Sequence, residues 1–282
     1  MTGRTCLVTG ANSGIGKETA LGLARMGAHV VIVCRNQQKG EAALADIRRE
    51  TGSSRLDLLV ADMSSFRSVR ALADTIRQRY PRLDVLINNA GAGVRYRTLS
   101  ADGIEMTLAG NYLGPALLTM LLLDLLKSSA PSRIVNVSSE AHRNSRLDLN
   151  DLQFETRKYH AFAAYGQSKL LMNAFTFELA RRLEGTGVTA NCLHPGVVRT
   201  NILPADAPFF LKIIVGVMKP FLLNPRQGAA VSLYLATSPD VATTSGKYFV
   251  KSKPMDSNSL SRDPQVMTAV WQWTEKTTRS AH

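Results

Sequence analysis

The chain carries the stretch Thr9-Gly10-Ala11-Asn12-Ser13-Gly14-Ile15-Gly16 between a short apolar run, Thr5–Thr9, and an amphipathic one, Gly14–Met26. A glycine-rich turn between a first strand and a first helix lets the backbone approach a pyrophosphate, and the N–H groups that open the helix face the anion. Glycines also occur in ordinary turns, but this position favours a dinucleotide site. The residues expected to bind the pyrophosphate are Gly10, Asn12, Ser13, Gly14, Ile15 and Gly16.

Short apolar segments alternate with longer amphipathic ones along most of the chain. The segments typical of strands are Thr5–Thr9, His29–Cys34, Leu56–Val60, Val85–Asn88, Arg133–Ser138, Thr189–Leu193 and Gly246–Val250. The segments with helical periodicity are Gly14–Met26, Gln37–Glu50, Ser64–Tyr80, Ala101–Lys127 and Ala161–Leu183. Strands that are apolar throughout suit a parallel sheet covered on both faces, and the alternation implies right-handed crossovers. The sequence therefore predicts one α/β domain, residues 1–282, with a doubly wound, mostly parallel seven-stranded sheet of the Rossmann type.

The composition is that of an ordinary globular protein with a surplus of positive charge. The 282 residues include 34 Lys+Arg and 22 Asp+Glu, which gives a net charge of +12, and 45% of them are apolar. The basic residues are scattered in ones and twos, whereas a nucleic-acid-binding arm shows runs or stripes of like charge. We therefore expect no nucleic-acid partner, although the charge favours encounter with an anionic ligand.

Cysteine usage and hydropathy bear on the compartment. Cys6, Cys34 and Cys192 lie far apart in apolar runs, so we expect buried thiols, no disulfide framework and no metal site. The longest apolar stretches, Leu113–Leu126 and Phe209–Leu223, are shorter than the roughly 18–20 residues of a membrane span. No signal peptide precedes the first predicted strand, and we expect a cytoplasmic protein.

The second predicted strand ends in Cys34-Arg35-Asn36 and not in an acidic residue. A carboxylate there would bind the ribose hydroxyls of NAD, whereas Arg35 offers a charged fork suited to a 2′-phosphate. The alternative is a solvated arginine at a strand end. Asp62 is placed to hold the adenine amino group and Asn88–Gly91 to line the adenine–ribose pocket, although either motif alone is also typical of a turn. The residues assigned to this part of an NADP(H) site are Arg35, Asn36, Asp62, Met63, Asn89, Ala90 and Gly91.

Tyr165 and Lys169 stand four residues apart in a segment with helical periodicity, which places them on one helix face. A neighbouring ammonium favours the phenolate, so we expect the pKa of Tyr165 to be lowered towards the working pH of a proton donor. The spacing alone is also typical of an amphipathic surface pair. Ser138-Ser139 follow the fifth predicted strand, however, and Asn111 lies in the preceding predicted helix, so these polar groups can converge at one end of the sheet.

With these motifs in the order Thr9–Gly16, Asp62, Asn88–Gly91, Asn111, Ser139, Tyr165/Lys169 and Pro195-Gly196, the chain resembles the short-chain dehydrogenase/reductase family over essentially its whole length. Within that family, Cys34-Arg35-Asn36, Asn111–Gly114, Val137–His142 and His194–Val198 look most like the retinol dehydrogenase branch. Many members of that branch carry an N-terminal membrane anchor, whereas this chain starts at its first predicted strand and is expected to have none.

The resemblance implies a role for each catalytic residue. Tyr165 would protonate the alkoxide, Ser139 would polarise the carbonyl, and Lys169 would bind the nicotinamide ribose and tune Tyr165. Asn111 would position a water that relays protons, and Ser139 is preferred to Ser138 because the family pattern matches the second serine. The residues implied at the nicotinamide end of the cofactor are Tyr165, Lys169, Pro195, Gly196, Val198 and Thr200, whereas His142 and His194 are expected to be structural.

The expected function is NADP(H)-dependent hydride transfer to or from a hydrophobic aldehyde, ketone or alcohol. Residues 201–224 fall where the family places its substrate lid, and Phe209–Leu223 is apolar, although a core helix, a subunit interface or a membrane-surface contact would show the same pattern. Leu117–Leu126 and Phe175–Leu183 are apolar enough to pair across a two-fold axis in a homodimer or homotetramer. The alternative function is a catalytically idle NADPH sensor or scaffold, against which the intact Asn, Ser, Tyr and Lys set argues.

Overall fold

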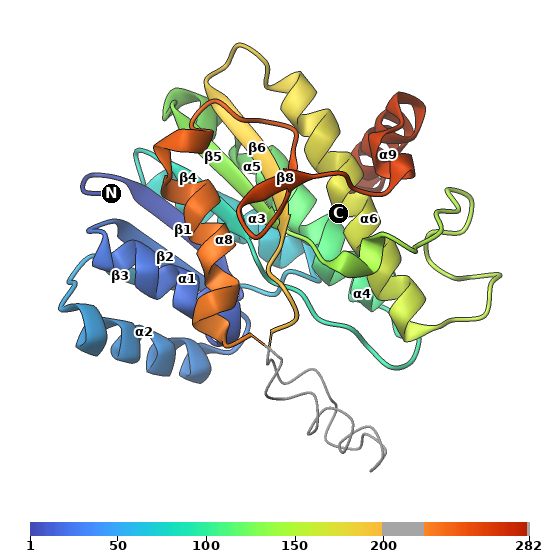
Figure 1. The fold of residues 1–282 in the computed structure, drawn as a ribbon. Helices are drawn as coiled ribbons and strands as arrows, with labels where there is room; N and C mark the ends of the chain where they lie inside the picture. Colours follow the sequence, from blue (N-terminus) through green and yellow to red (C-terminus); the bar gives the residue numbers. More distant parts are fainter. Residues whose placement is uncertain (199–222, 281–282) are drawn as a thin grey trace.

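The computed structural model describes residues 1–198 and 223–280, which form one sheet with helices on both faces (Figure 1). The strands, in chain order, are β1 (Thr5–Thr9), β2 (His29–Cys34), β3 (Leu56–Val60), β4 (Val85–Asn88), β5 (Ser132–Val137), β6 (Val188–His194), β7 (Tyr248–Val250) and β8 (Lys253–Met255). The α-helices of the described residues are α1 (Gly14–Arg25), α2 (Gln37–Thr51), α3 (Phe66–Arg79), α4 (Met106–Leu108), α5 (Gly114–Ser128), α6 (Ala161–Arg182), α8 (Pro225–Thr237) and α9 (Pro264–Ser280).

The strand order β3-β2-β1-β4-β5-β6-β7-β8 confirms the predicted doubly wound, mostly parallel sheet. Strands β1 to β7 pair in parallel, and only β7 and β8 are antiparallel. The sheet has one strand more than the seven predicted. The additional strand, β8, is three exposed residues that contain a proline, so it lacks the apolar run by which the others are recognised.

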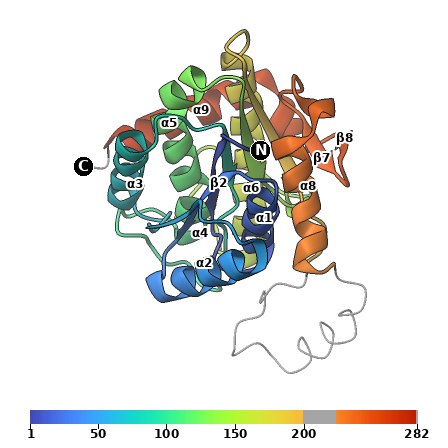
Figure 2. The ribbon, with the colours of Figure 1, turned by 90° about the vertical axis from the view of Figure 1, so that its left-hand side faces the viewer.

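Alternating side chains of the strands fill two separate cores. In β1, Leu7 belongs to the core under α3, α5, α6 and α9, whereas Val8 belongs to the core under α1, α2 and α8. Figure 2 shows the two helical layers on either side of the sheet. The strand order runs outward in one direction from β1 and in the other direction from β4. The loops that follow β1 and β4 therefore diverge at the carboxyl edge of the sheet, and ligands bind at this place in open sheets of this kind.

The segment predicted as one helix, Ala101–Lys127, is shorter and interrupted. Helix α4 begins only at Met106, because Gly103 adopts a positive φ of 73° and the side chain of Glu105 caps the first N–H groups. A turn of π-helix, η1 (Ala109–Leu113), then joins α4 to α5. The span Met106–Ser128 has the length and apolarity of a membrane-crossing helix, but 72% of its most apolar window is buried inside the protein, as in a core helix.

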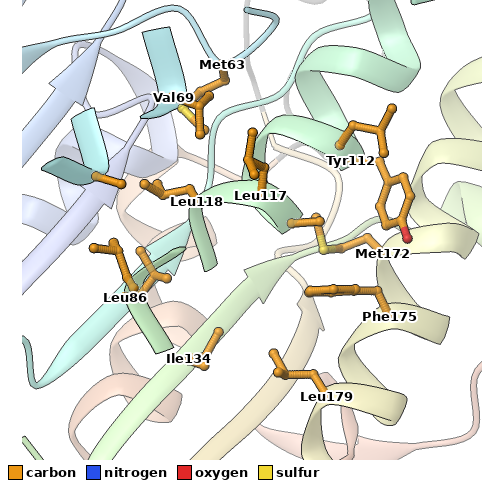
Figure 3. Packing of buried hydrophobic residues seen from close by; sticks show 14 of the residues in the cluster. Met63, Val69, Leu86, Tyr112, Leu117, Leu118, Ile134, Met172, Phe175 and Leu179 are labelled. Carbon is orange, nitrogen blue, oxygen red and sulfur yellow. The ribbon is translucent and has the colours of Figure 1, made fainter. Parts of the chain in front are cut away.

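The apolar segment Phe175–Leu183 does not offer the two-fold interface that its sequence suggests. Helix α9, which the sequence reading missed, covers it: Trp271 stacks on Phe175 with ring centroids 5.2 Å apart and an interplanar angle of 6°. Phe175 and Leu179 are buried in the same cluster as Tyr112 and Met172 (Figure 3). These side chains are therefore already buried within the chain. The three cysteines are free thiols and buried, as predicted from their apolar settings.

Candidate active site

The glycine-rich turn closes tightly between β1 and α1. Gly10 and Gly14 adopt positive φ angles of 67° and 57°, which favour glycine. A Cβ on Gly16 would clash with the carbonyl oxygen of Gly10 and with the side-chain amide of Asn89, so only glycine allows this approach. Ser13 stands at the start of α1 and, within the described residues, makes no side-chain cap. The first N–H groups of α1 are thus left for a ligand, and an anionic pyrophosphate fits them.

The side-chain amides of Asn88 and Asn89 were expected to line the adenine–ribose pocket, but both make hydrogen bonds within the protein. Asn88 is buried in the sheet, where its Nδ2 donates to Asn136 and Thr119 at 2.8 and 2.9 Å. Asn89 donates from Nδ2 to the carbonyl oxygens of Thr9 and Gly10, so its side chain braces the glycine turn against β4. Sequence reasoning missed this supporting role, because no local pattern reports which strand end an amide reaches.

Arg35 and Asp62 meet at the adjacent ends of β2 and β3. Nη1 of Arg35 lies 3.9 Å from Oδ2 of Asp62, and the Arg35 side chain is 76% exposed. Asn36 accepts from Lys39 N and caps α2, so the positive end of that helix lies beside Arg35. Lys17, in contrast, is paired with Asp46 at 2.6 Å and is neutralised there. Arg35, whose contact with Asp62 is long and whose side chain is mostly exposed, therefore remains an accessible cation at this strand end.

Ser139, not Ser138, turns towards Tyr165. Ser138 is buried and its hydroxyl donates to the carbonyl of Lys169, 3.4 Å away, which ties β5 to α6. Ser139 begins the short turn η2 (Glu140–His142), and its hydroxyl lies near enough to that of Tyr165 to lower the pKa of the phenol. Because neighbouring residues of an extended chain point in opposite directions, one serine braces the fold and the other reaches the site.

Lys169 lies one helical turn beyond Tyr165 and is buried. Its Nζ donates to the carbonyl oxygen of Val137 at 2.9 Å and lies 5.6 Å from the centroid of the Tyr165 ring. A Cβ built on Gly91 would lie 3.3 Å from both Lys169 Nζ and Asn111 Oδ1, so these two polar groups converge on the same point of backbone. An ammonium has three N–H donors, so Lys169 has capacity left for a ribose hydroxyl.

Asn111 is held in the π-helical turn η1 by two hydrogen bonds. Its Oδ1 accepts from Ala92 N at 2.8 Å, and its Nδ2 donates to the hydroxyl of Ser168 at 3.3 Å. Single π-turns inside helices are frequent at functional sites, because the extra residue re-aims a side chain. Helix α5 then starts at Gly114, where any Cβ would clash with the carbonyl oxygen of Met63. The backbone of Met63 therefore lies against the first residue of α5.

The electrostatics of the pair differ from the expectation. Burial raises the pKa of Tyr165, an effect that the hydrogen bond from Ser139 only partly offsets. Burial also lowers the pKa of Lys169 to about 8. The expected lowering of the Tyr165 pKa by the ammonium is thus wrong for the protein alone, because desolvation outweighs a charge that is itself destabilised. Tyr165 stays a protonated phenol throughout the neutral range.

The predicted nicotinamide segment is described only in part. Pro195 and Gly196 follow β6, and Gly196 has a φ of 88°. Val198 is buried against Gly228 of α8 and pairs with Leu223. Thr200 and residues 201–222 of the predicted lid lie outside the described residues. Among residues 1–198 and 223–280, no group of three His, Cys, Asp or Glu side chains is arranged to hold a metal ion.

The sequence of this chain is similar to those of known proteins. The family model described as short chain dehydrogenase matches residues 4–208. The chain is 45% identical over 273 residues to retinol dehydrogenase 13 of Homo sapiens, which covers 95% of this chain and 82% of that protein. It is 43% identical over 290 residues to retinol dehydrogenase 14 of Homo sapiens, which covers 98% and 86% of the two chains.

Solved structures show the same fold. The crystal structure of an uncharacterized protein from Mycobacterium Paratuberculosis superposes with a TM-score of 0.79 and 32% identity, covering 99% of this chain and 94% of that one. A short chain dehydrogenase from Shigella flexneri, solved in complex with NADP, superposes with a TM-score of 0.70 and 26% identity, covering 88% and 97%.

Proposed function

This chain belongs to the short-chain dehydrogenase family of oxidoreductases, and from that premise we propose that it transfers hydride between NADP(H) and a hydrophobic aldehyde, ketone or alcohol. The observation that carries the proposal is the convergence of Ser139, Tyr165, Lys169 and Asn111 at the carboxyl edge of the sheet, beside an open helix start. An idle dinucleotide-binding protein would have no physical need for all four groups at one end of the sheet.

The nicotinamide, when bound, supplies or accepts the hydride. The chain's own part is proton transfer and polarisation: the phenol of Tyr165 donates its proton to the substrate oxygen, and the hydroxyl of Ser139 donates a hydrogen bond to the same oxygen. Lys169 Nζ holds a ribose hydroxyl with the donors that Val137 leaves unused. The side chain of Asn111 accepts a hydrogen bond from the backbone N–H of Ala92 and so holds this loop near Lys169.

The direct test is a substrate panel with the purified protein, followed by nicotinamide absorbance. We expect NADPH-dependent reduction of long-chain or cyclic apolar aldehydes and ketones, with little activity on small polar sugars. Tight NADPH binding without turnover of any carbonyl or alcohol in the panel would instead favour the sensor or scaffold function.

The preference for NADPH is proposed to rest on Arg35. Arg35→Asp replaces an attractive charge by a repulsive one, beside Asp62 at 3.9 Å. Because a charge-assisted hydrogen bond contributes about 1.5–3 kcal/mol, we expect NADPH affinity to fall at least about ten- to hundredfold while NADH affinity rises or holds. Dissociation constants for both cofactors, measured by fluorescence titration, decide it.

The control for this charge reversal is Arg48→Asp, which makes the same change near the other end of α2. The NADPH preference of the wild type should shrink as salt increases, since Arg35 is largely exposed. An Arg35→Asp protein with the wild-type ratio of the two affinities would remove Arg35 from the site.

The apolar stretch Phe209–Leu223 is proposed to cover the substrate. Replacing Phe209 and Phe210 together by Ser is expected to raise KM for bulky apolar carbonyls more than for small ones, because the lost contact scales with apolar area at roughly 25 cal/mol per Å². Steady-state kinetics on a homologous series of aldehydes measure this. An equal effect across the series would assign the stretch to packing or to an interface.

A further inference from the structure

The peptide unit that joins Ser139 to Glu140 has both of its polar groups bound by histidine rings. The carbonyl oxygen of Ser139 accepts from Nδ1 of His142 at 2.6 Å. The N–H of Glu140 donates to Nδ1 of His194 at 3.2 Å. His142 ends the turn η2, whereas His194 ends β6, and Glu140 and His194 are 54 residues apart in the chain. This peptide plane, directly after the catalytic serine, is thus held from two sides.

The two hydrogen bonds require opposite tautomers. A carbonyl only accepts, so His142 must carry its proton on Nδ1, and an amide N–H only donates, so His194 must leave Nδ1 bare. Nε2 of His142 is buried and has no hydrogen-bond partner among the described residues. A second proton on that ring would therefore be buried without an acceptor, and a proton on Nδ1 of His194 would break its bond to Glu140.

The surroundings of both rings disfavour positive charge. The His142 ring packs edge-on against Tyr248 of β7, with centroids 4.7 Å apart, and the Tyr248 hydroxyl donates to Glu140 at 3.1 Å. The titratable and charged groups that face the two rings are Glu140, Arg143, Tyr248 and the other histidine. Burial lowers the pKa of each histidine, and Arg143 adds to this effect while Glu140 opposes it.

A third contact fixes the turn from the C-terminal part of the chain. Nδ2 of Asn258 donates to the carbonyl oxygens of His142 and Arg143, 3.2 and 2.8 Å away. The backbone of His142 therefore cannot follow its ring if the ring moves. A change in the protonation of these rings therefore acts on the hydrogen bonds of the Ser139–Glu140 peptide.

We propose that His142 and His194 form a clamp, the histidine clamp, that positions Ser139 for reaction and opens when His194 takes up a proton. The positioning role rests on the proposed function, whereas the clamp itself is a property of the protein alone. Since both folded-state pKa values lie below the ordinary value of about 6.5, the clamp is intact at neutral pH. It is lost as the pH falls through the lowered pKa of His194, since a proton on Nδ1 removes the acceptor of the Glu140 N–H.

Asparagine variants of the two histidines keep the hydrogen bond but remove the group that titrates. In His142→Asn and His194→Asn, an amide that does not titrate can place its Nδ2 or Oδ1 where the ring Nδ1 stood. We expect both variants to keep kcat at neutral pH, and His194→Asn to lose the fall in kcat on the acid side. His142→Leu and His194→Leu remove the bond, and we expect kcat to drop about ten- to a hundredfold at every pH with the NADPH Kd unchanged.

The matched control is His160→Asn, an exposed histidine before α6, which should leave the pH profile of kcat as in the wild type. Asparagine variants as slow as the leucine variants, or an acid limb that persists in His194→Asn, would overturn the positioning role. If a leucine variant fails to fold, the asparagine variants still test the proposal.

A readout without substrate tests the clamp by itself. The chain has five histidines, and nitrogen-15 NMR of the free protein distinguishes their tautomers, with the asparagine variants giving the assignments. We expect His142 protonated on Nδ1 and His194 on Nε2 at pH 7, both titrating below about 6.5. Either ring charged at pH 7, or both in the same tautomer, would overturn the clamp. A clamp confirmed by NMR in a protein with no active substrate would instead count against the proposed function alone.

Discussion

Replacing Tyr165 by Phe is expected to lower kcat for carbonyl reduction by about 10²–10⁴-fold, the usual contribution of a positioned general acid. The change keeps the ring beside Lys169 Nζ and removes only the hydroxyl that meets Ser139. Because burial raises the pKa of Tyr165, the wild-type phenol is protonated at neutral pH and ready to donate. We expect the NADPH Kd to change little, since the glycine turn and Arg35 are untouched.

The measurement is single-turnover reduction of the best substrate in the panel, together with a cofactor titration. Tyr234→Phe, which removes a hydroxyl on α8 outside this cluster, is the matched control and should keep wild-type turnover. A Tyr165→Phe protein with near-normal kcat would show that another group protonates the substrate.

Replacing Phe175 by Ala is expected to lower the free energy of unfolding by about 3–5 kcal/mol, the usual cost of truncating a buried phenylalanine. Phe175 is fully buried between Trp271, stacked at 5.2 Å, and Tyr112, edge-on at 6.1 Å (Figure 3). The truncation would leave a cavity under α9 that these large, rigid rings cannot fill. Urea unfolding, with the midpoint and slope fitted together, measures the loss.

Phe162→Ala is the control, since this ring on the same helix is 65% exposed and its removal should change stability by no more than about 0.5 kcal/mol. A small loss for Phe175→Ala would mean that α9 does not hold the outer face of α6. That face would then again be a candidate for pairing between subunits.

Local patterns in the sequence were enough for most of the sheet. The strands β1 to β4 begin and end at the residues predicted from their apolar runs. Helices α8 and α9 and strand β8 were missed, the last two for different reasons. Helix α9 mixes polar residues with its aromatic anchors, so its role is visible only once it lies on α6, and β8 is too short and polar to show a period.

The convergence of the proposed catalytic residues was also predictable, because its geometry is largely local. Tyr165 and Lys169 share a helix face by their spacing, and Ser139 follows directly from the end of β5. Parallel strands bring their carboxyl ends to one edge, so residues at those ends meet without further information. The supporting amides were not readable, since the destinations of Asn88 and Asn89 depend on which strand lies next to β4.

The sequence by itself thus determined the fold class, the glycine-rich turn and the spacing of the proposed catalytic side chains, because periodicity and turn chemistry are properties of neighbouring residues. Only the tertiary structure decided what surrounds them. Burial sets the direction of the Tyr165 and Lys169 pKa shifts, and α9 closes the face of α6. The peptide after Ser139 meets a ring from β6, and such partners are distant in the chain, so no local pattern records them.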